Sequence, residues 1–267
     1  MRHCLPAAAI MLAAACSSAF AGVVITSTQV NPASKEESQI SGFIEADRLK
    51  IVTPQNTVIF RNDLKKVWVI GGAIYVEITP EVVSAFAERL AAAQTPGSPE
   101  QLRLQERLAK LPPQQRAIAE QQLKGLSAGA GAAQQIVYAK TGQAKMVGEW
   151  RCELYDKSVG GQKQEELCIA PISALAFGDS DFRALELFTA FMGPVATSPM
   201  APRADYFNWA AMNKAIGFSG IPLQATLLSN GGASLQDTMQ KVERVSIPAD
   251  AFDLPPGLTK RALAGAP

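Results

Sequence analysis

Histidine is almost absent from this sequence. The chain of 267 residues has one, His3. Histidine is the side chain that proteins use most often as a general base, as a metal ligand and as a switch near neutral pH. His3 lies in a segment that we expect to be removed before folding. The mature chain is therefore expected to lack imidazole, which excludes Ser-His-Asp and Cys-His catalytic sites.

Residues 1–21 have the features of a secretory signal peptide. Arg2 and His3 form a basic start, an apolar run follows from Leu5 to Ala15, and Ala19-Phe20-Ala21 is an A-x-A cleavage site. The apolar run is too short to span a bilayer. We expect cleavage near Ala21 and a periplasmic or secreted protein. Removal of 21 residues from 267 would leave 246, enough for one large β-rich domain or two small ones.

Cys16 allows a second interpretation of the same segment. Ala13-Ala14-Ala15-Cys16 is similar to a lipoprotein processing site, at which lipid would anchor the protein through Cys16. Such sites usually have leucine three residues before the cysteine, whereas this chain has Ala13 there and Leu12 one place earlier. Cleavage after Ala21 is the prediction, and lipid anchoring at Cys16 is its alternative.

The chain also lacks an excess of charge and a long apolar run. It has 25 Lys and Arg residues against 24 Asp and Glu, and loss of Arg2 would leave 24 of each. A neutral chain has no basic surface for nucleic acid or for an anionic membrane. No later apolar stretch reaches the roughly 20 residues of a membrane span. We therefore expect a soluble, exported protein with no nucleic-acid partner and no transmembrane span.

Cysteine is scarce as well, because only Cys152 and Cys168 remain outside the predicted signal peptide. They are equally far from Gly160, and Gly160-Gly161 is typical of a tight hairpin turn. A hairpin would bring the two cysteines opposite each other, and an oxidising compartment favours a disulfide between them. Two free thiols are the alternative. A β-bulge would shift the pairing, since this register mixes polar and apolar residues on one face.

What the sequence does contain is a series of short strands with a period of two. Leu49 and Ile51 alternate with Arg48 and Lys50, which is typical of an antiparallel sheet with one wet and one dry face. Ile74, Val76 and Ile78 alternate with Tyr75 and Glu77 in the same way. The strands predicted in this way cover residues 23–30, 40–45, 49–53, 57–60, 67–70, 74–78, 135–139, 147–155, 165–169, 221–228 and 235–247.

Helices are predicted between these strands. Thr79-Pro80-Glu81 and Ser98-Pro99-Glu100 both have the features of helix starts. The narrow apolar face of this region predicts a helical arm or lid on the surface, an insertion over about residues 79–134. Two further amphipathic helices are expected around Phe182 to Phe191 and from Asp205 to Ile216. The predicted fold class is α+β: an unclosed or half β-barrel with helices on its concave face. The predicted single domain covers residues 22–260, and residues 261–267 form a tail.

Motifs of known catalytic sites are missing. No serine is followed three residues later by lysine, and Gly217-Phe218-Ser219-Gly220 lacks the spacing of a nucleophile elbow. Asp179 and Asp181 lack the glycine and the distal glutamate of a calcium loop, so we expect them to cap a helix. The doublet Glu165-Glu166 is expected in a solvated loop. We therefore expect no enzymatic activity, no metal and no cofactor.

Several segments resemble an exported bacterial family that is known only as a domain of unknown function. They cover residues 22–26, 47–51, 56–60, 111–116 and 247–252, with Pro255-Pro256-Gly257 behind the last. The order of Asp47 to Ile51 before Asn56 to Phe60 is in turn similar to carriers of the lipoprotein-localisation type (LolA/LolB-like). This resemblance implies an unclosed antiparallel barrel whose cavity holds acyl chains. The long insertion after Ile78 departs from these compact carriers, and its helices would either leave the cavity open or fill it.

These observations lead to two functional hypotheses. The first is a periplasmic, non-enzymatic binder or carrier of a hydrophobic, lipid-like ligand. Its candidate ligand-binding residues are Ile74, Val76, Leu223, Leu227, Phe188 and Trp209. The alternative is an envelope protein that binds another protein through the helical arm, with a structural or stress-related role.

Overall fold

A computed structural model describes residues 21–95, 97–112, 116, 136–196, 209–229 and 232–262. The predicted signal peptide up to residue 20, with His3 and Cys16, lies outside these ranges. So do most of the second half of the predicted insertion, residues 205–208 at the start of the last predicted helix, and residues 263–267 of the predicted tail.

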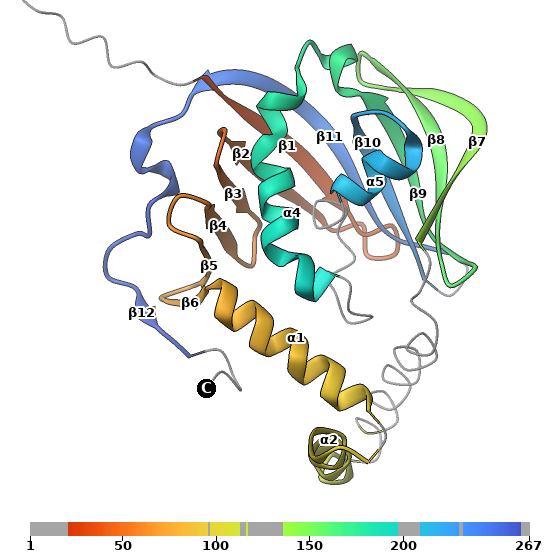
Figure 1. Ribbon diagram of the computed structural model, residues 1–267. Helices are drawn as coiled ribbons and strands as arrows, with labels where there is room; N and C mark the ends of the chain where they lie inside the picture. Colours follow the sequence, from red (N-terminus) through yellow and green to blue (C-terminus); the bar gives the residue numbers. More distant parts are fainter. Residues whose placement is uncertain are drawn as a thin grey trace, which may run out of the picture.

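The described strands form one sheet of 12 strands that does not close on itself (Figure 1). Neighbouring strands are antiparallel, except that β12 pairs with β6 in parallel. The order is β12-β6-β5-β4-β3-β2-β1-β11-β10-β9-β8-β7. The predicted fold class, an α+β fold with an unclosed antiparallel sheet, is confirmed. The strands are β1 (Ala21–Val30), β2 (Glu37–Ile44), β3 (Arg48–Val52), β4 (Thr57–Arg61), β5 (Lys66–Gly71), β6 (Ile74–Ile78), β7 (Ile136–Val147), β8 (Trp150–Val159), β9 (Gln162–Pro171), β10 (Gly220–Ser229), β11 (Gly232–Ser246) and β12 (Thr259–Lys260).

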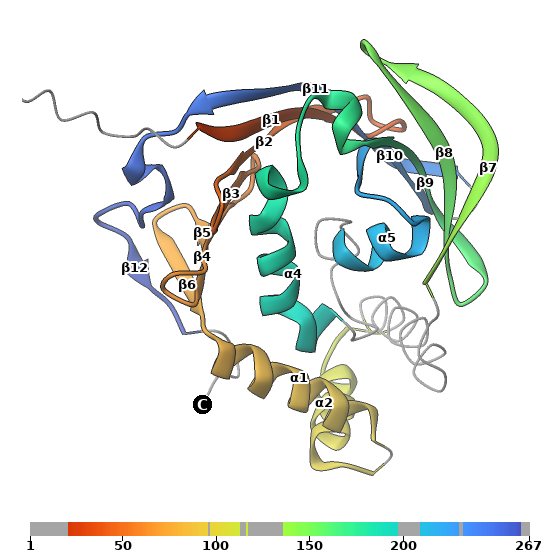
Figure 2. The same cartoon turned by 45° about the horizontal axis from the view of Figure 1, so that its top comes forward.

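The sheet curves around two helices on its concave side, α4 (Arg183–Ala196) and α5 (Trp209–Ile216) (Figures 1 and 2). α1 (Pro80–Gln94) lies against α4, and α2 (Pro99–Ala109) packs on α1. Both helices of the insertion begin at the predicted prolines. Within the described residues, no helix has the length and apolar character needed to cross a membrane.

The insertion divides into a packed part and an exposed part. On α1, the Val83 side chain is buried at 2% exposure, whereas Phe86 is exposed. On α2, Leu102 is 53% exposed. The predicted surface location therefore suits α2, while α1 also contributes a buried residue.

The outer, convex side of β3 to β6 is covered by the C-terminal segment, residues 247–260 (Figure 2). This segment contains the short helix η4 (Ala249–Phe252), whose Phe252 is fully buried. Lys50 Nζ donates to the Ala251 carbonyl at 3.0 Å. We call the resulting cluster the outer core. Its buried members are Ile59, Trp68, Ile70, Ile247 and Phe252.

The outer core changes the expected alternation of wet and dry faces. In β4, Phe60 faces the helices and Ile59 faces the C-terminal segment, and both are 0% exposed. This strand is therefore buried on both faces. The run Val58-Ile59-Phe60 is apolar without alternation, as is typical of a strand that is buried on both faces.

The hairpin of β8 and β9 confirms the predicted disulfide. Cys152 and Cys168 are bonded, with their Cα atoms 5.3 Å apart. The two-residue turn is Gly160-Gly161, and both glycines have positive φ, which favours glycine. The two cysteines are not directly opposite, because Cys168 pairs with Leu154. The turn Gly160-Gly161 shifts the pairing by one residue relative to a hairpin centred on Gly160, and the register shift next to Lys157 adds one more, so the bulge alternative holds and the simple register is wrong.

One predicted strand boundary is also wrong. Residues 147–155 were expected to form a single strand, but β7 ends at Val147 and β8 begins at Trp150. Gly148, with φ at +57°, turns the chain between them. Glycine is an ordinary turn signal, and the predicted strand passed through it.

Candidate functional site

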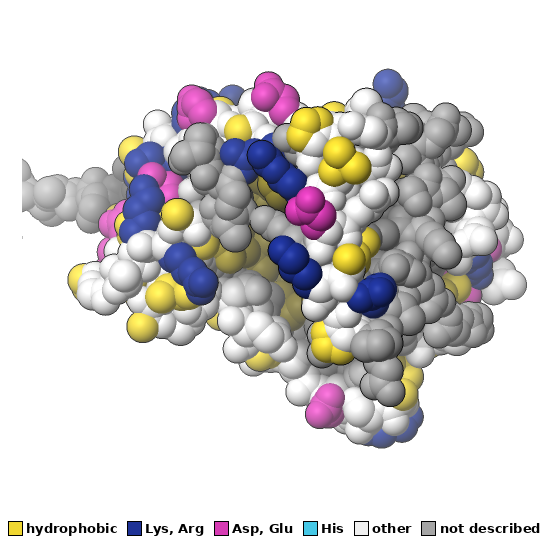
Figure 3. All heavy atoms as spheres, turned by 90° about the horizontal axis from the view of Figure 1, so that it is seen from below, with side chains coloured by type: hydrophobic (Ala, Val, Ile, Leu, Met, Phe, Trp, Pro, Cys, Tyr) yellow, Lys and Arg dark blue, Asp and Glu magenta, His cyan; other side chains and the backbone are white. Residues whose placement is uncertain are grey.

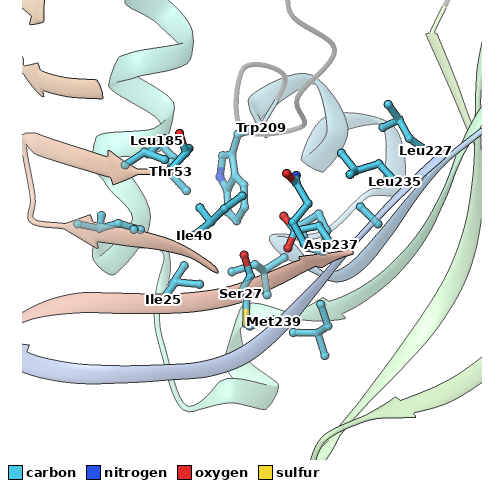
Figure 4. A pocket seen from close by; sticks show the side chains of 18 of the residues that line it. Ile25, Ser27, Ile40, Thr53, Leu185, Trp209, Leu227, Leu235, Asp237 and Met239 are labelled. Atoms are coloured by element: carbon cyan, nitrogen blue, oxygen red, sulfur yellow. The ribbon is translucent and has the colours of Figure 1, made fainter. Parts of the chain in front are cut away.

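A cavity of about 480 Å³ lies between the concave face of the sheet and the two covering helices (Figure 4). It is partly open to solvent, and most of its surface is apolar. The sheet therefore has incomplete cover, which leaves a space that the packed side chains do not fill. The apolar lining side chains include Ile25, Ile40, Ile44, Leu49, Ile51, Leu185, Trp209, Ile221, Leu223, Leu227, Leu235 and Met239.

The strand period of two places these side chains. On β10, Ile221, Leu223, Ala225 and Leu227 share the inward face, and all four line the cavity. The inward positions of β1 and β11 follow the same rule, because successive side chains of a strand point to opposite faces. A curved antiparallel sheet thus provides a continuous apolar floor from residues far apart in the sequence.

The helices provide the opposite wall. Leu185 of α4 and Trp209 of α5 face the cavity (Figure 4). Trp209 is 4% exposed and stacks on Phe182, with ring centroids 5.7 Å apart. Phe182 ends the short helix η2 (Asp179–Phe182) that leads into α4. This stacking holds α5 against α4 and fixes the indole at the cavity wall.

The structure brings three of the six predicted ligand-binding residues to this cavity. Leu223, Leu227 and Trp209 line it. Phe188 does not: it is 1% exposed and packs edge-on against Phe60, with centroids 5.4 Å apart. It therefore belongs to the core that α4 forms over β4.

The other two predicted residues lie on β6, away from the cavity. β6 is four strands from β2 in the sheet, and Ile74 is 39% exposed at the start of the strand. Val76 is half-buried and is not among the lining residues. The sequence showed their common face but not their distance from the space under the helices. Whether any of the six binds a ligand stays a prediction.

Asp237 is a carboxylate among the apolar lining residues, which the sequence analysis did not select (Figure 4). The Ser27 hydroxyl and the Thr238 N–H hydrogen-bond to it, and both lower its pKa. Burial is the larger effect and raises the pKa of Asp237 above its usual 3.8. Its Oδ1 atom is buried and has no hydrogen-bond partner among the described residues. The carboxylate is thus only partly satisfied.

Glu165 is the second acid at the cavity, and its placement corrects the prediction of a solvated loop. It lies in β9 at 3% exposure and forms an ion pair with Lys157 of β8, which is 2% exposed. The two residues are direct cross-strand partners. Within this buried pair, the charges of the lysine and the glutamate offset each other. The prediction treated Glu165 and Glu166 alike, but neighbouring side chains of a strand point to opposite faces. Glu166 lies on the other face of the sheet and forms an ion pair with Lys163.

A signal for Asp237 was present in the sequence. Leu235, Asp237 and Met239 occupy alternate positions of one strand, so an acid on the apolar face was readable from the period of two. Ser27, the hydrogen-bond partner, follows Ile25 on the inward face of β1 in the same way. What the sequence did not show is that β1 and β11 are neighbours.

The surface around the cavity mixes apolar and charged side chains. Seen from below, the molecule is hollowed, and hydrophobic side chains lie within the hollow between basic side chains (Figure 3). Four further lining residues are Gln29 and Leu227, near the ends of β1 and β10, and Thr53 and Gln55, in the turn between β3 and β4.

Comparisons with known proteins do not assign a family. No family model matches the chain, and no curated protein matches it. Among solved structures, PNGF-II, determined in a C2 space group, gives a TM-score of 0.38 at 9% sequence identity. The match covers 91% of this chain and 31% of that one, so the chain spans about a third of that protein's length. This likeness is too low to support an argument, and the resemblance to the lipoprotein-localisation carriers stays a prediction.

Proposed function

We propose that this protein is a non-enzymatic, periplasmic binder or carrier of a hydrophobic, lipid-like ligand. The observation that carries the proposal is the apolar cavity of about 480 Å³ on the concave face of the sheet. Its volume lies within the roughly 300–1,000 Å³ that is usual for ligand sites. Apolar walls with few polar groups favour an alkyl or acyl chain, because such a ligand is removed from water there.

The arrangement of the walls also supports a carrier. The floor is a single curved sheet, and the roof consists of α4 and α5. Phe188 of α4 packs on Phe60 of the sheet, and Trp209 of α5 stacks on Phe182. Cover of this kind leaves the cavity partly open, so a chain has a route in and out. The resemblance noted for residues 47–60 agrees with this proposal.

The tryptophans provide a direct test of where a ligand binds. The chain has three: Trp209 at the cavity wall, Trp68 in the outer core and Trp150 at the start of β8. A neutral brominated chain, 11-bromo-1-undecanol, should quench Trp209 because bromine acts only at close range. The Trp209→Phe variant should lose this quenching, while calorimetry should still detect binding. Trp68 should remain unquenched in both proteins.

A cavity-filling variant provides the matching loss of binding. Ala225 is half-buried on the inward face of β10, and Ala225→Phe would occupy part of the cavity. Affinity for the bromoundecanol should fall about tenfold or more, which corresponds to roughly 1.4 kcal/mol. Ala139→Phe is the control, because Ala139 is exposed on β7. If 11-bromo-1-undecanol neither quenches Trp209 nor binds to the folded native protein, the proposed function is wrong.

A further inference from the structure

Two acids line the cavity, and they differ in how their charge is balanced. Glu165 is paired with the buried Lys157. Asp237 has no basic partner among the described residues, and its two hydrogen bonds come from the Ser27 hydroxyl and the Thr238 N–H. A carboxylate can accept about four hydrogen bonds. The cavity therefore contains one carboxylate whose charge and acceptor capacity are incompletely used.

A carboxylate in apolar surroundings is unfavourable unless a partner compensates for the water it has lost. Stability alone would favour a neutral or apolar residue at this position, as at Leu235 and Met239 on the same face. Burial raises the pKa of Asp237 for the same reason, because the charged form loses its hydration. The missing partner would have to come from the space that Asp237 faces, which is the cavity.

We propose that the ligand of this cavity is an amphipathic amine, whose protonated head group binds the Asp237 carboxylate while its apolar chain occupies the remaining space. This inference rests on the proposed function and specifies its ligand class. A protonated amine supplies both a positive charge and N–H donors, so it fits an underused carboxylate better than a neutral hydroxyl does. An anionic head group would meet like charge, since the Glu165–Lys157 pair contributes no net charge.

The neighbours of Asp237 leave room for such a head group. Its cross-strand partner on β10 is Ala225, a small side chain that also lines the cavity. On the other side, β1 places Gln29 opposite Asp237, and the Gln29 side chain adds a further acceptor at the cavity surface. The terminal torsion of an aspartate is broad, so a small rotation is enough to turn either oxygen toward a ligand.

Three probes with the same chain length separate these head groups: undecylamine, 1-undecanol and undecanoate. Each is used at neutral pH to displace 11-bromo-1-undecanol and so to restore Trp209 fluorescence. In the native protein, undecylamine should bind about tenfold or more tightly than 1-undecanol, because hydrogen bonds to charged groups exceed neutral ones by that order. Undecanoate should bind weakest.

Two variants show whether Asp237 causes the preference. Asp237→Asn keeps the size of the side chain and removes its charge, so amine and alcohol should bind alike. Glu243→Gln removes a charge from a partly exposed position on the same strand that does not line the cavity, and it should keep the native order of affinities. Thermal unfolding of both variants verifies that they are folded.

The outcomes distinguish the two proposals. Equal binding of amine and alcohol by the native protein, or an amine preference that survives in Asp237→Asn, overturns the amine inference but leaves the hydrophobic carrier intact. Failure of every probe, bromoundecanol included, overturns the proposed function and the inference with it. An amine preference lost in Asp237→Asn and kept in Glu243→Gln supports both.

Discussion

The two faces of the sheet bury a carboxylate in opposite ways. On the outer face, Glu77 of β6 accepts hydrogen bonds from Trp68 Nε1 at 3.1 Å, Lys66 Nζ at 3.2 Å and Lys260 Nζ at 2.8 Å. In the cavity, Asp237 has two neutral donors, and its Oδ1 atom has no hydrogen-bond partner in the described part of the chain. The protein itself thus provides partners for the Glu77 carboxylate, whereas the Asp237 carboxylate is only partly provided with them.

The pKa values move in opposite directions for this reason. The hydrogen bond from Lys260, followed by the one from Trp68, lowers the pKa of Glu77 from 4.5 to about 2. Burial raises the pKa of Asp237, and its hydrogen bonds from Ser27 and Thr238 do not offset this effect. A carboxylate whose hydrogen-bond acceptors all have partners stabilises the fold. A carboxylate in a cavity with an acceptor that lacks a partner is typical of a ligand-binding site.

Packing shows the same contrast. The outer core is closed by Phe252, which is fully buried between the C-terminal segment and the sheet. The concave face retains a cavity of about 480 Å³ under its helices. Closed packing contributes stability, while an open space contributes little stability and allows binding. The following predictions test this division between an outer core that holds the fold and an inner cavity that binds.

The largest expected effect is on the outer core. Phe252→Ala should lower the free energy of unfolding by about 3–5 kcal/mol, because it removes a fully buried ring and leaves a cavity. Urea denaturation measures the change. The binding of 11-bromo-1-undecanol should be unaltered below the melting temperature. Phe86→Ala on α1 is the control, since this exposed ring should matter by less than about 1 kcal/mol.

A weakened bromoundecanol affinity in folded Phe252→Ala would contradict the division, because it would couple the two faces. Loss of stability without loss of affinity would support the division between an outer core that stabilises the fold and a cavity that binds.

The next effect concerns Glu77. Its pKa is lowered, so the stability that it contributes is present above pH 4.5 and is lost as the pH falls toward 2. Glu77→Gln should cost about 1–2 kcal/mol at pH 7, since the amide still accepts from Trp68 but loses its charge, and the two lysines are partly exposed. The stabilities of native and variant proteins should converge near pH 2.

Denaturation at several pH values measures this difference. A constant gap between Glu77→Gln and the native protein from pH 7 to pH 2 would show that the carboxylate acts through shape and not through charge.

Much of the fold was predictable from local patterns, because hairpins are specified by neighbouring residues. Gly160-Gly161 marked the turn of its hairpin, and the disulfide followed from the spacing of its cysteines. The C-terminal cover of the outer face was not predictable. Phe252 and Ile59 are almost 200 positions apart, and nothing local indicates that they meet.

The cavity was predictable only in part. Alternation identified inward faces, and thus Leu223 and Leu227, because the period of a strand is local. Alternation did not separate the strand faces that line the cavity from those that lie elsewhere, so Val76 was selected as well. The amphipathic pattern of α4 likewise did not show that Phe188 packs on Phe60 and not on the cavity. That separation depends on where α4 lies along the sheet, which is a property of tertiary packing.

The smallest expected effect is the change that Asp237 causes in the stability of the protein without ligand. The sign of this change tests the proposal. The pKa of Asp237 is raised in the folded state, so ionisation in the folded protein is unfavourable compared with ionisation in the unfolded chain. Stability should therefore fall as the pH rises above 3.8 through the raised pKa, and it should stay lowered at higher pH. This dependence is opposite to that of Glu77.

Asp237→Asn should remove this dependence. At pH 7 the variant should be as stable as the native protein or more stable, by less than about 1 kcal/mol, because a neutral amide costs less to bury and keeps an acceptor for Ser27. Near pH 3 the native carboxyl is itself neutral, so the difference should vanish. Glu243→Gln should show no such gain at neutral pH. A variant that is less stable than the native protein at every pH would mean that Asp237 holds the fold as Glu77 does, and the two faces would then not differ in the way proposed. A gain in stability at neutral pH together with a loss of amine binding would instead identify Asp237 as a residue kept for the ligand at the expense of the fold.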